Sequence, residues 1–137
     1  LYTAFRYPFN YGFIPSTWSG DDDPLDIVVL SSESISTGTL IECRVIGLLQ
    51  AEDEEGEDTK VIAVPKAKVD PAFANINDTA DIPDYLKDKL RHFFENYKSI
   101  EPGKWVKITG WVGKEEAIKV VEEAILRYQK RFPAATP

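Results

Sequence analysis

Four aspartates lie within the short stretch Gly20–Asp26, where a single proline stiffens the chain. They are Asp21, Asp22, Asp23 and Asp26. Carboxylates packed this closely repel one another unless a cation lies among them. Oxygen ligands of this kind suit a hard divalent cation. The stretch predicts a metal site at the start of a strand, and an acidic, solvated turn is the alternative that it leaves open.

A second acidic run covers residues 52–58 and contains Gly56. It lies between two apolar runs and is followed by Lys60. A strand, an acidic turn with glycine and a second strand are typical of a β-hairpin. Taken alone, such a hairpin tip is more often solvated than functional.

The opening segment alternates aromatic residues with Pro, Asn and Gly. We expect Phe9 and Phe13 to line the core, as on an edge strand. Tyr7 and Tyr11 differ from them, because a phenol has a polar tip that must find a partner.

Several short strands must position these side chains. Apolar runs and alternation predict strands over about 26–31, 40–49, 59–65 and 104–112. The alternation in the second of these places Cys43 on its apolar face. We therefore expect an inert core thiol there and not a catalytic one.

Two helices are expected near the end of the chain. The first extends from Pro83 to about residue 98, with Asp81 as a nearby cap. Its apolar stripe leaves His92 at the surface, as a contact residue and not a metal ligand. The second spans about 114–131, with acidic residues at its start and basic residues at its end, as the helix dipole favours.

Composition limits the classes of protein that remain. The 137 residues fit one domain, 1–137, with a sizeable core. A formal net charge of −7 disfavours a nucleic-acid partner, whose phosphates attract Lys and Arg. No apolar run reaches the roughly 18 residues of a membrane span. A single cysteine suits a reducing compartment, and we expect a cytoplasmic protein.

The expected architecture is α+β with much β structure. Short strands around an early acidic turn, followed by two helices, predict a small closed antiparallel β-barrel. The barrel would be OB-like, with the two helices flanking it.

The chain resembles the family I soluble inorganic pyrophosphatases of the prokaryotic type, through five ordered sequence blocks that span about residues 3–128. Asp21–Ile27 resembles the D-x-D-P-x-D signature of that family. The other blocks are Tyr7–Gly12, the second acidic run with Lys60, and the segments Phe93–Lys98 and Gly103–Lys107.

This resemblance implies hydrolysis of inorganic pyrophosphate to two phosphates by a water activated between divalent metal ions. It implies several Mg²⁺ ions per active site, with Mn²⁺ also acceptable to such ligands. General chemistry agrees, since coordination to a divalent metal makes water far easier to deprotonate. The resemblance also implies a homo-oligomer, commonly a hexamer.

The resemblance also implies a role for each matching residue. Asp21, Asp26 and Asp58 match the ligands of the metals that activate the water. Asp53 matches, with Asp58, the ligands of the metal that arrives with substrate. Asp23 matches the proton acceptor. The groups that match phosphate-binding residues are Tyr11, Lys60, Tyr97 and Lys98.

One departure concerns the start of the chain. The family has a Lys, a Glu and an Arg on strands upstream of the Tyr7–Gly12 block, and Arg6 lies too close to that block to replace the arginine. We expect that these strands were left out of the sequence, so that the domain is N-terminally incomplete. Removing two strands from a barrel would expose its hydrogen-bonding edges.

Two rival functions fit parts of the same sequence. An EF-hand loop beginning at Asp21 needs Gly at its sixth place and Glu at its twelfth, where Asp26 and Ser32 stand. A calcium site of another type remains open. An OB-type nucleic-acid binder would need a basic groove, and the chain is acidic.

Overall fold

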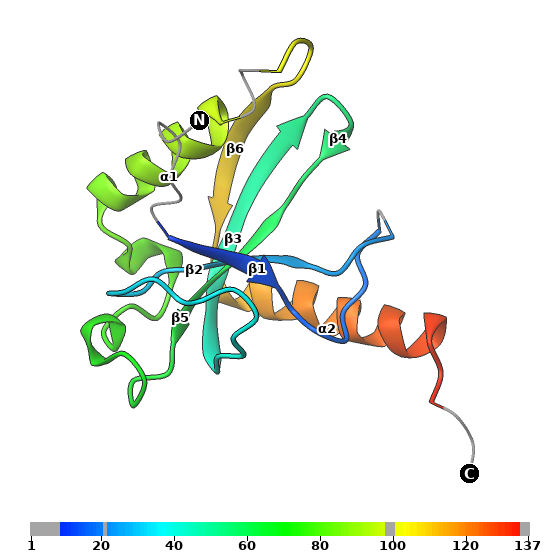
Figure 1. Ribbon diagram of the computed structural model, residues 1–137, viewed down its shortest axis with the longest axis horizontal. Helices are drawn as coiled ribbons and strands as arrows, with labels where there is room; N and C mark the ends of the chain where they lie inside the picture. The colour runs from blue at the N-terminus through cyan, green and yellow to red at the C-terminus, as the bar shows by residue number, and fades with distance from the viewer. Residues whose placement is uncertain (1–8, 21, 98–100, 135–137) are drawn as a thin grey trace.

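The computed structural model describes residues 9–20, 22–97 and 101–134. Its strands belong to one six-stranded sheet with the order β1-β2-β5-β3-β4, in which β6 pairs with the free side of β3 (Figure 1). The bounds are β1 Asn10–Phe13, β2 Asp26–Val29, β3 Cys43–Asp53, β4 Gly56–Glu57, β5 Lys60–Pro65 and β6 Val106–Val112. Two short 3-10 helices, η2 Pro71–Phe73 and η3 Thr79–Asp81, precede helix α1 Asp84–Asn96, and helix α2 Lys114–Arg131 follows β6.

The sheet corrects part of the predicted architecture. The α+β class and the two helices are confirmed, but the sheet is mixed, since β2 pairs with β5 in parallel. Within the described residues the sheet is also open, because β1 pairs with β2 alone. The prediction of a closed antiparallel barrel therefore finds no support. Parallel pairing of two short strands leaves no local signal in their sequences.

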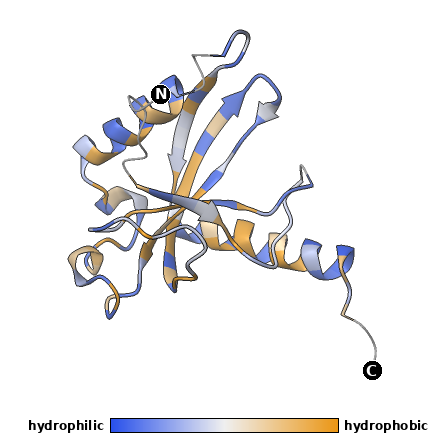
Figure 2. Cartoon of the chain, in the orientation of Figure 1, coloured by the Kyte–Doolittle hydropathy of each residue, from blue (hydrophilic) through white to orange (hydrophobic). Residues whose placement is uncertain are grey.

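Strand β5 is the centre of the sheet, and all six of its residues are buried. Successive side chains on a strand point to opposite faces. Ile62 belongs to the core beneath α1, together with Leu90 and Phe94, whereas its neighbour Val61 belongs to the core beneath α2. Each face of the sheet is thus covered by one helix, which explains why β5 is apolar after Lys60, its first residue (Figure 2).

The helices follow their predictions closely. α2 has the predicted bounds, and its Ala117 and Ala124 are fully buried against the sheet. α1 begins three residues after its predicted cap, Asp81, which instead completes a capping box with Asp78 in η3. The prediction that Asp81 caps α1 was wrong, because the Asp81 carboxylate instead accepts a hydrogen bond within the capping box of the 3-10 helix η3. His92 is exposed, as expected.

The aromatic opening segment divides differently from the prediction. Phe9 is buried in the core, whereas Phe13 is 61% exposed, so its predicted core position was wrong. Cys43 is half-buried, and burial raises the pKa of its thiol, which fits an inert side chain. No helix in the described part of the chain combines the length and apolarity needed to cross a membrane.

Candidate active site

Strand register brings the predicted site residues to the face of the sheet that α1 covers. Asp26 shares its face of β2 with Val28, and Lys60 shares its face of β5 with Ile62. Both apolar residues lie in the core beneath α1. The parallel register of β2 and β5 then places Asp26 beside Lys60.

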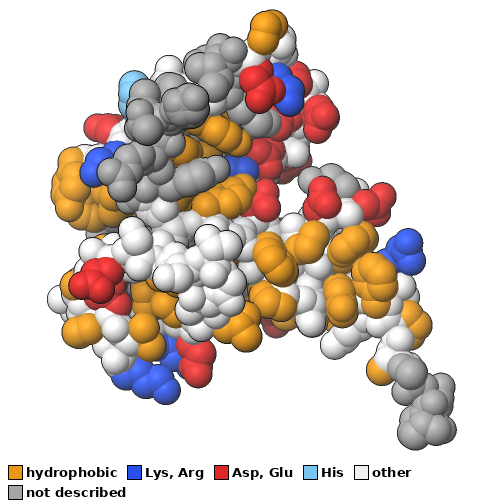
Figure 3. All heavy atoms as spheres, viewed as in Figure 1, with side chains coloured by type: hydrophobic (Ala, Val, Ile, Leu, Met, Phe, Trp, Pro, Cys, Tyr) orange, Lys and Arg blue, Asp and Glu red, His pale blue; other side chains and the backbone are white. Residues whose placement is uncertain are grey.

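Strand pairing, alternation and a backbone hydrogen bond place three more residues on or beside this face. Tyr11 pairs with Val28 across the antiparallel β1–β2 ladder. Asp53 lies two residues beyond Ala51, a member of the same core. The backbone N–H of Asp58 donates to the Ala51 carbonyl oxygen at 2.9 Å, which ties the hairpin tip to the sheet. Acidic side chains accordingly gather over the hairpin and over the loop before β2 (Figure 3).

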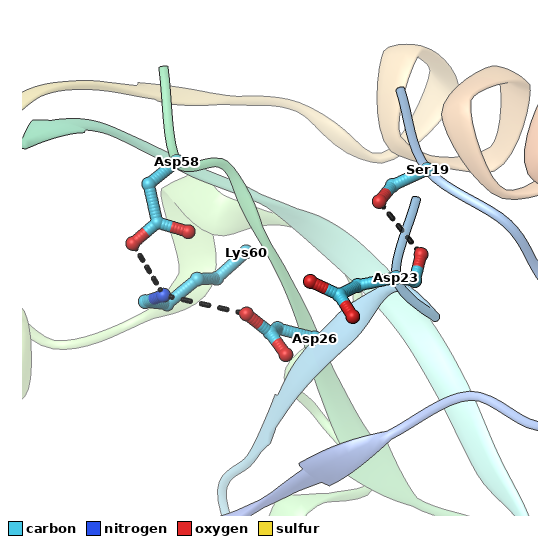
Figure 4. Close-up of polar contacts among 5 residues, drawn as sticks. All are labelled: Ser19, Asp23, Asp26, Asp58 and Lys60. Carbon is cyan, nitrogen blue, oxygen red and sulfur yellow. Dashed lines mark hydrogen bonds and ion pairs between the residues drawn. The ribbon is translucent and has the colours of Figure 1, made fainter. Parts of the chain in front are cut away.

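Lys60 is the centre of the site. Its side chain is only 2% exposed, and its ammonium lies 2.9 Å from Asp58 Oδ2 and 3.7 Å from Asp26 Oδ2 (Figure 4). The rings of Tyr11 and Phe94 each have their centroid 5.4 Å from the same nitrogen. A buried ammonium is unfavourable unless it is paired, and here two carboxylates and two ring faces compensate it.

Tyr11 is held as a neutral phenol. Tyr11 is 38% exposed; partial burial of its phenol, the nearby charge of Asp26 and a hydrogen bond to that carboxylate raise its pKa above the ordinary tyrosine value. The charge of Asp58 acts in the same direction. Tyr11 therefore keeps its O–H as a donor throughout the neutral pH range.

The loop before β2 is fixed through its backbone. The carbonyl oxygen of Asp23 accepts hydrogen bonds from the Ser19 backbone N–H at 2.8 Å and from the Ser19 hydroxyl at 2.7 Å. Thr17, buried in the same loop, accepts from the Leu25 N–H at 3.1 Å. The carboxylate of Asp23 is left exposed and points toward Asp26 and Lys60 (Figure 4).

Asp53 lies at the end of β3, where the hairpin turns. Its Oδ1 accepts a hydrogen bond from the Glu55 N–H at 2.9 Å, and Asp53 pairs with Gly56 across the turn. Gly56 has φ 122°, a backbone conformation that favours glycine. The carboxylate of Asp53 thus helps to shape the acidic hairpin.

The structure brings together Asp26, Asp58, Lys60 and Tyr11, and directs Asp23 toward them. Tyr97 reaches the same region from the end of α1, where its ring stacks on Phe93 at a centroid distance of 5.3 Å. Two predicted site residues, Asp21 and Lys98, lie outside the described residues.

The donor set of this site fits a hard divalent cation. Among the described residues, no three carboxylate, imidazole or thiol groups are gathered closely enough to hold a metal ion by themselves. However, Asp26 and Asp58 already converge on one positive charge, the Lys60 ammonium. Their carboxylate oxygens are the ligands that Mg²⁺ prefers.

Sequence reasoning missed three residues of this region. Ser19 and Thr17 fix the loop before β2, and nothing in their local sequence distinguishes them from other loop hydroxyls. Phe94 was expected in the apolar stripe of α1 and in the Phe93–Lys98 block, but not as a neighbour of Lys60. In the structure it also meets the Lys60 ammonium, a contact between distant segments that helical periodicity cannot indicate.

Known proteins of similar sequence indicate one family. A family model described as inorganic pyrophosphatase matches residues 1–129. An inorganic pyrophosphatase of Aeropyrum pernix is 55% identical over 129 residues, covering 94% of this chain and 73% of the relative. One from Saccharolobus solfataricus is 56% identical over 127 residues, covering 93% and 74%.

Solved structures agree as well. An inorganic pyrophosphatase of Helicobacter pylori superposes with a TM-score of 0.90 at 48% identity, covering 94% of this chain and 76% of that one. One from Thermus thermophilus gives a TM-score of 0.83 at 47% identity, covering 87% and 68%. The sequence blocks, the fold and these matches lead to one conclusion: the chain belongs to the inorganic pyrophosphatase family.

Proposed function

We propose that this protein hydrolyses inorganic pyrophosphate to two phosphates. The observation that carries the proposal is the buried Lys60 ammonium between Asp26 and Asp58, on the same face of the sheet as Tyr11 and Asp53. This arrangement offers oxygen ligands for cations and a fixed positive charge for a phosphate. The names of the relatives support the choice of substrate.

Asp21, Asp26, Asp53 and Asp58 are the residues that would hold Mg²⁺, or Mn²⁺ in its place. Bound divalent cations would neutralise these aspartates for the approach of a polyanion and lower the pKa of a water molecule. The carboxylate donors and the net charge of −7 support this assignment.

Asp23 is proposed as the proton acceptor. It takes a proton from the attacking water while the water oxygen forms a bond to one phosphorus atom. The bond from that phosphorus to the bridging oxygen breaks, and the second phosphate leaves with the bridging oxygen. Support comes from the exposed carboxylate of Asp23, which hydrogen bonds to its backbone hold toward the site.

Tyr11, Lys60, Tyr97 and Lys98 are proposed to bind the phosphates. The neutral phenol of Tyr11 can donate a hydrogen bond to an anionic oxygen, which a phenolate could not. Lys60 supplies a charge from a buried and pre-arranged position. In phosphoryl transfer such positioning and electrostatic stabilisation provide most of the catalysis.

A homohexameric assembly in the cytoplasm completes the proposal. Both features rest on the family relationship. Exposed apolar side chains on α2, including Ile125 and Leu126, are compatible with burial in an assembly. Analytical ultracentrifugation at micromolar concentration measures the assembly directly.

Phosphate release by the full-length protein tests the proposed activity. We expect release from pyrophosphate with Mg²⁺ and none after chelation by EDTA. A phosphomonoester serves as the comparison substrate and should be hydrolysed far more slowly. Equal rates with and without Mg²⁺, or no release at all, would exclude the proposed function.

A further inference from the structure

The Lys60 ammonium has two different kinds of neighbour. Carboxylates of Asp26 and Asp58 approach it from one set of strands, and aromatic rings of Tyr11 and Phe94 lie under it, each at 5.4 Å. Substrate and metal ions would compete for the carboxylates. Phe94 has no polar group and is only 1% exposed, so its contact with Lys60 persists when other ions arrive.

Phe94 also connects Lys60 to the other phosphate-binding groups. Its ring centroid lies 6.1 Å from that of Tyr11 and 6.1 Å from that of Tyr97. Phe9 supports it from β1's side at 5.2 Å, and Phe93 from its own helix at 5.5 Å. The ring is therefore fixed by its neighbours and offers Lys60 a rigid surface.

We propose that Phe94 is a positioning residue, whose ring face holds the Lys60 ammonium where substrate phosphate arrives. The role in substrate binding rests on the proposed function; the role in holding Lys60 does not. A lysine stem has several rotatable bonds, and fixing it before substrate binds lowers the entropy lost on binding. A cation–π contact with a desolvated ammonium favours one position by about 30-fold.

The alternative is that Phe94 only fills the core beneath α1. Phe94→Leu would lower the stability of the folded protein under either role, so a stability measurement does not distinguish the two roles. Fluorination does, because fluorine atoms withdraw electron density from the ring face while the ring keeps its shape. A structural role is insensitive to this change, whereas a cation–π contact weakens as fluorine atoms are added.

The experiment replaces Phe94 by mono-, di- and trifluorophenylalanine in the full-length protein. Phe93 receives the same series as a matched control, since it is also buried in the cluster but is not one of the two rings at Lys60. At position 94 we expect KM for pyrophosphate to rise stepwise, by about 3- to 10-fold in all, with kcat changed less than about twofold. At position 93 both constants should stay within about twofold of wild type.

A second measurement does not depend on activity. Protons above an aromatic ring are shielded, so the NMR resonance of the Lys60 ε-methylene protons reports whether the ring is beneath them. We expect Phe94→Leu to move this resonance toward the position of free lysine, and Phe93→Leu, which removes only one support of the Phe94 ring, to move it much less.

Three results overturn the proposal: a KM that does not respond to fluorination at position 94, an equal rise at position 93, or a Lys60 resonance that does not move in Phe94→Leu. If the wild-type protein releases no phosphate from pyrophosphate, the proposed function fails, and the Lys60 resonance alone decides whether Phe94 positions the lysine.

Discussion

Asp22 and Asp23 are neighbours of the same residue type with different local structures. Asp22 is exposed and has φ 64°, a left-handed conformation that asparagine also adopts readily. Asp23 points its carboxylate toward Asp26 and Lys60. Composition and spacing do not distinguish the two residues, whereas the family resemblance assigns a role to Asp23 alone, and the backbone geometry now distinguishes them as well.

Asp23→Asn removes the proposed proton acceptor and keeps the size of the side chain. We expect kcat for pyrophosphate to fall by about 100-fold or more, since general base catalysis contributes that much. Affinity for Mg²⁺, measured by calorimetry, should change little. Asp22→Asn is the matched control and should keep wild-type kcat. Unchanged turnover in Asp23→Asn at neutral pH would refute the assignment of the base.

Tyr11 gives a prediction about pH. Burial and the Asp26 carboxylate raise its pKa above the value of about 10 in the unfolded chain. The folded state therefore favours the neutral phenol, and this contribution to stability is complete below pH 10. It is lost only as the pH rises toward the higher, folded-state pKa.

Ultraviolet absorbance of phenolate tests this assignment. In the folded protein, the absorbance rise near pH 10 should be the same for wild type and for Tyr11→Phe, because Tyr11 does not ionise there. After denaturation, the phenolate absorbance near pH 10 should increase by the contribution of one further tyrosine in wild type, but not in Tyr11→Phe. If folded Tyr11→Phe shows less phenolate absorbance near pH 10 than folded wild type, by the contribution of one tyrosine, then the pKa of Tyr11 is not raised.

At the scale of elements, sequence patterns predicted the local structure of helices and turns better than they predicted which strands pair in the sheet. The bounds of α2 follow from its apolar period and its charged ends, which are local properties. The hairpin of β3, β4 and β5 also follows from the acidic run with Gly56. The parallel pairing of β2 with β5 depends on contacts between distant segments, and no local signal encodes it.

Gly47 shows a close approach that alternation does not reveal. β3 is irregular between Val45 and Gly47, and there η3 and β6 come near its backbone. A Cβ atom on Gly47 would meet the side chain of Thr79 and lie 2.6 Å from the carbonyl oxygen of Val112. Neither the η3 segment nor the β6 backbone can move away without losing its own contacts.

Gly47→Ala should therefore destabilise the fold by about 2 kcal/mol or more, as overpacking does. Urea unfolding followed by circular dichroism measures the change as a lower midpoint with an unchanged slope. Gly20→Ala is the control, because nothing lies within 4 Å of a Cβ added at Gly20. We expect that change to stay within about 0.5 kcal/mol. Equal midpoints for the two variants would contradict the close packing at Gly47.

At the scale of the molecule, the site depends on three segments that are far apart in sequence. Alternation correctly indicates which side chains of one strand share a face. It does not indicate which strands are neighbours, so the sequence predicted the site residues from their resemblance and not from their geometry. The sheet order places β2 next to β5, and this order gives Lys60 the Asp26 carboxylate, whereas Asp58 lies two residues before Lys60 in the sequence.

The charge of the whole molecule leads to a prediction about metal removal. The net charge is −7, and acidic side chains gather near the site (Figure 3). Bound cations would relieve their repulsion in the folded state, whereas the unfolded chain keeps its carboxylates apart. Mg²⁺ at ten times its Kd should stabilise the protein by about 1.4 kcal/mol, which raises Tm by about 3 to 6 °C.

Differential scanning calorimetry with Mg²⁺ and with EDTA measures this increase, with NaCl added to equal ionic strength. Asp58→Asn should show a smaller increase at the same Mg²⁺ concentration, because it loses a proposed ligand. The comparison uses the increments and not the Tm values, since Asp58 also pairs with Lys60 and its loss lowers the baseline. An increase in Asp58→Asn as large as in wild type would mean that Mg²⁺ acts elsewhere on the acidic surface.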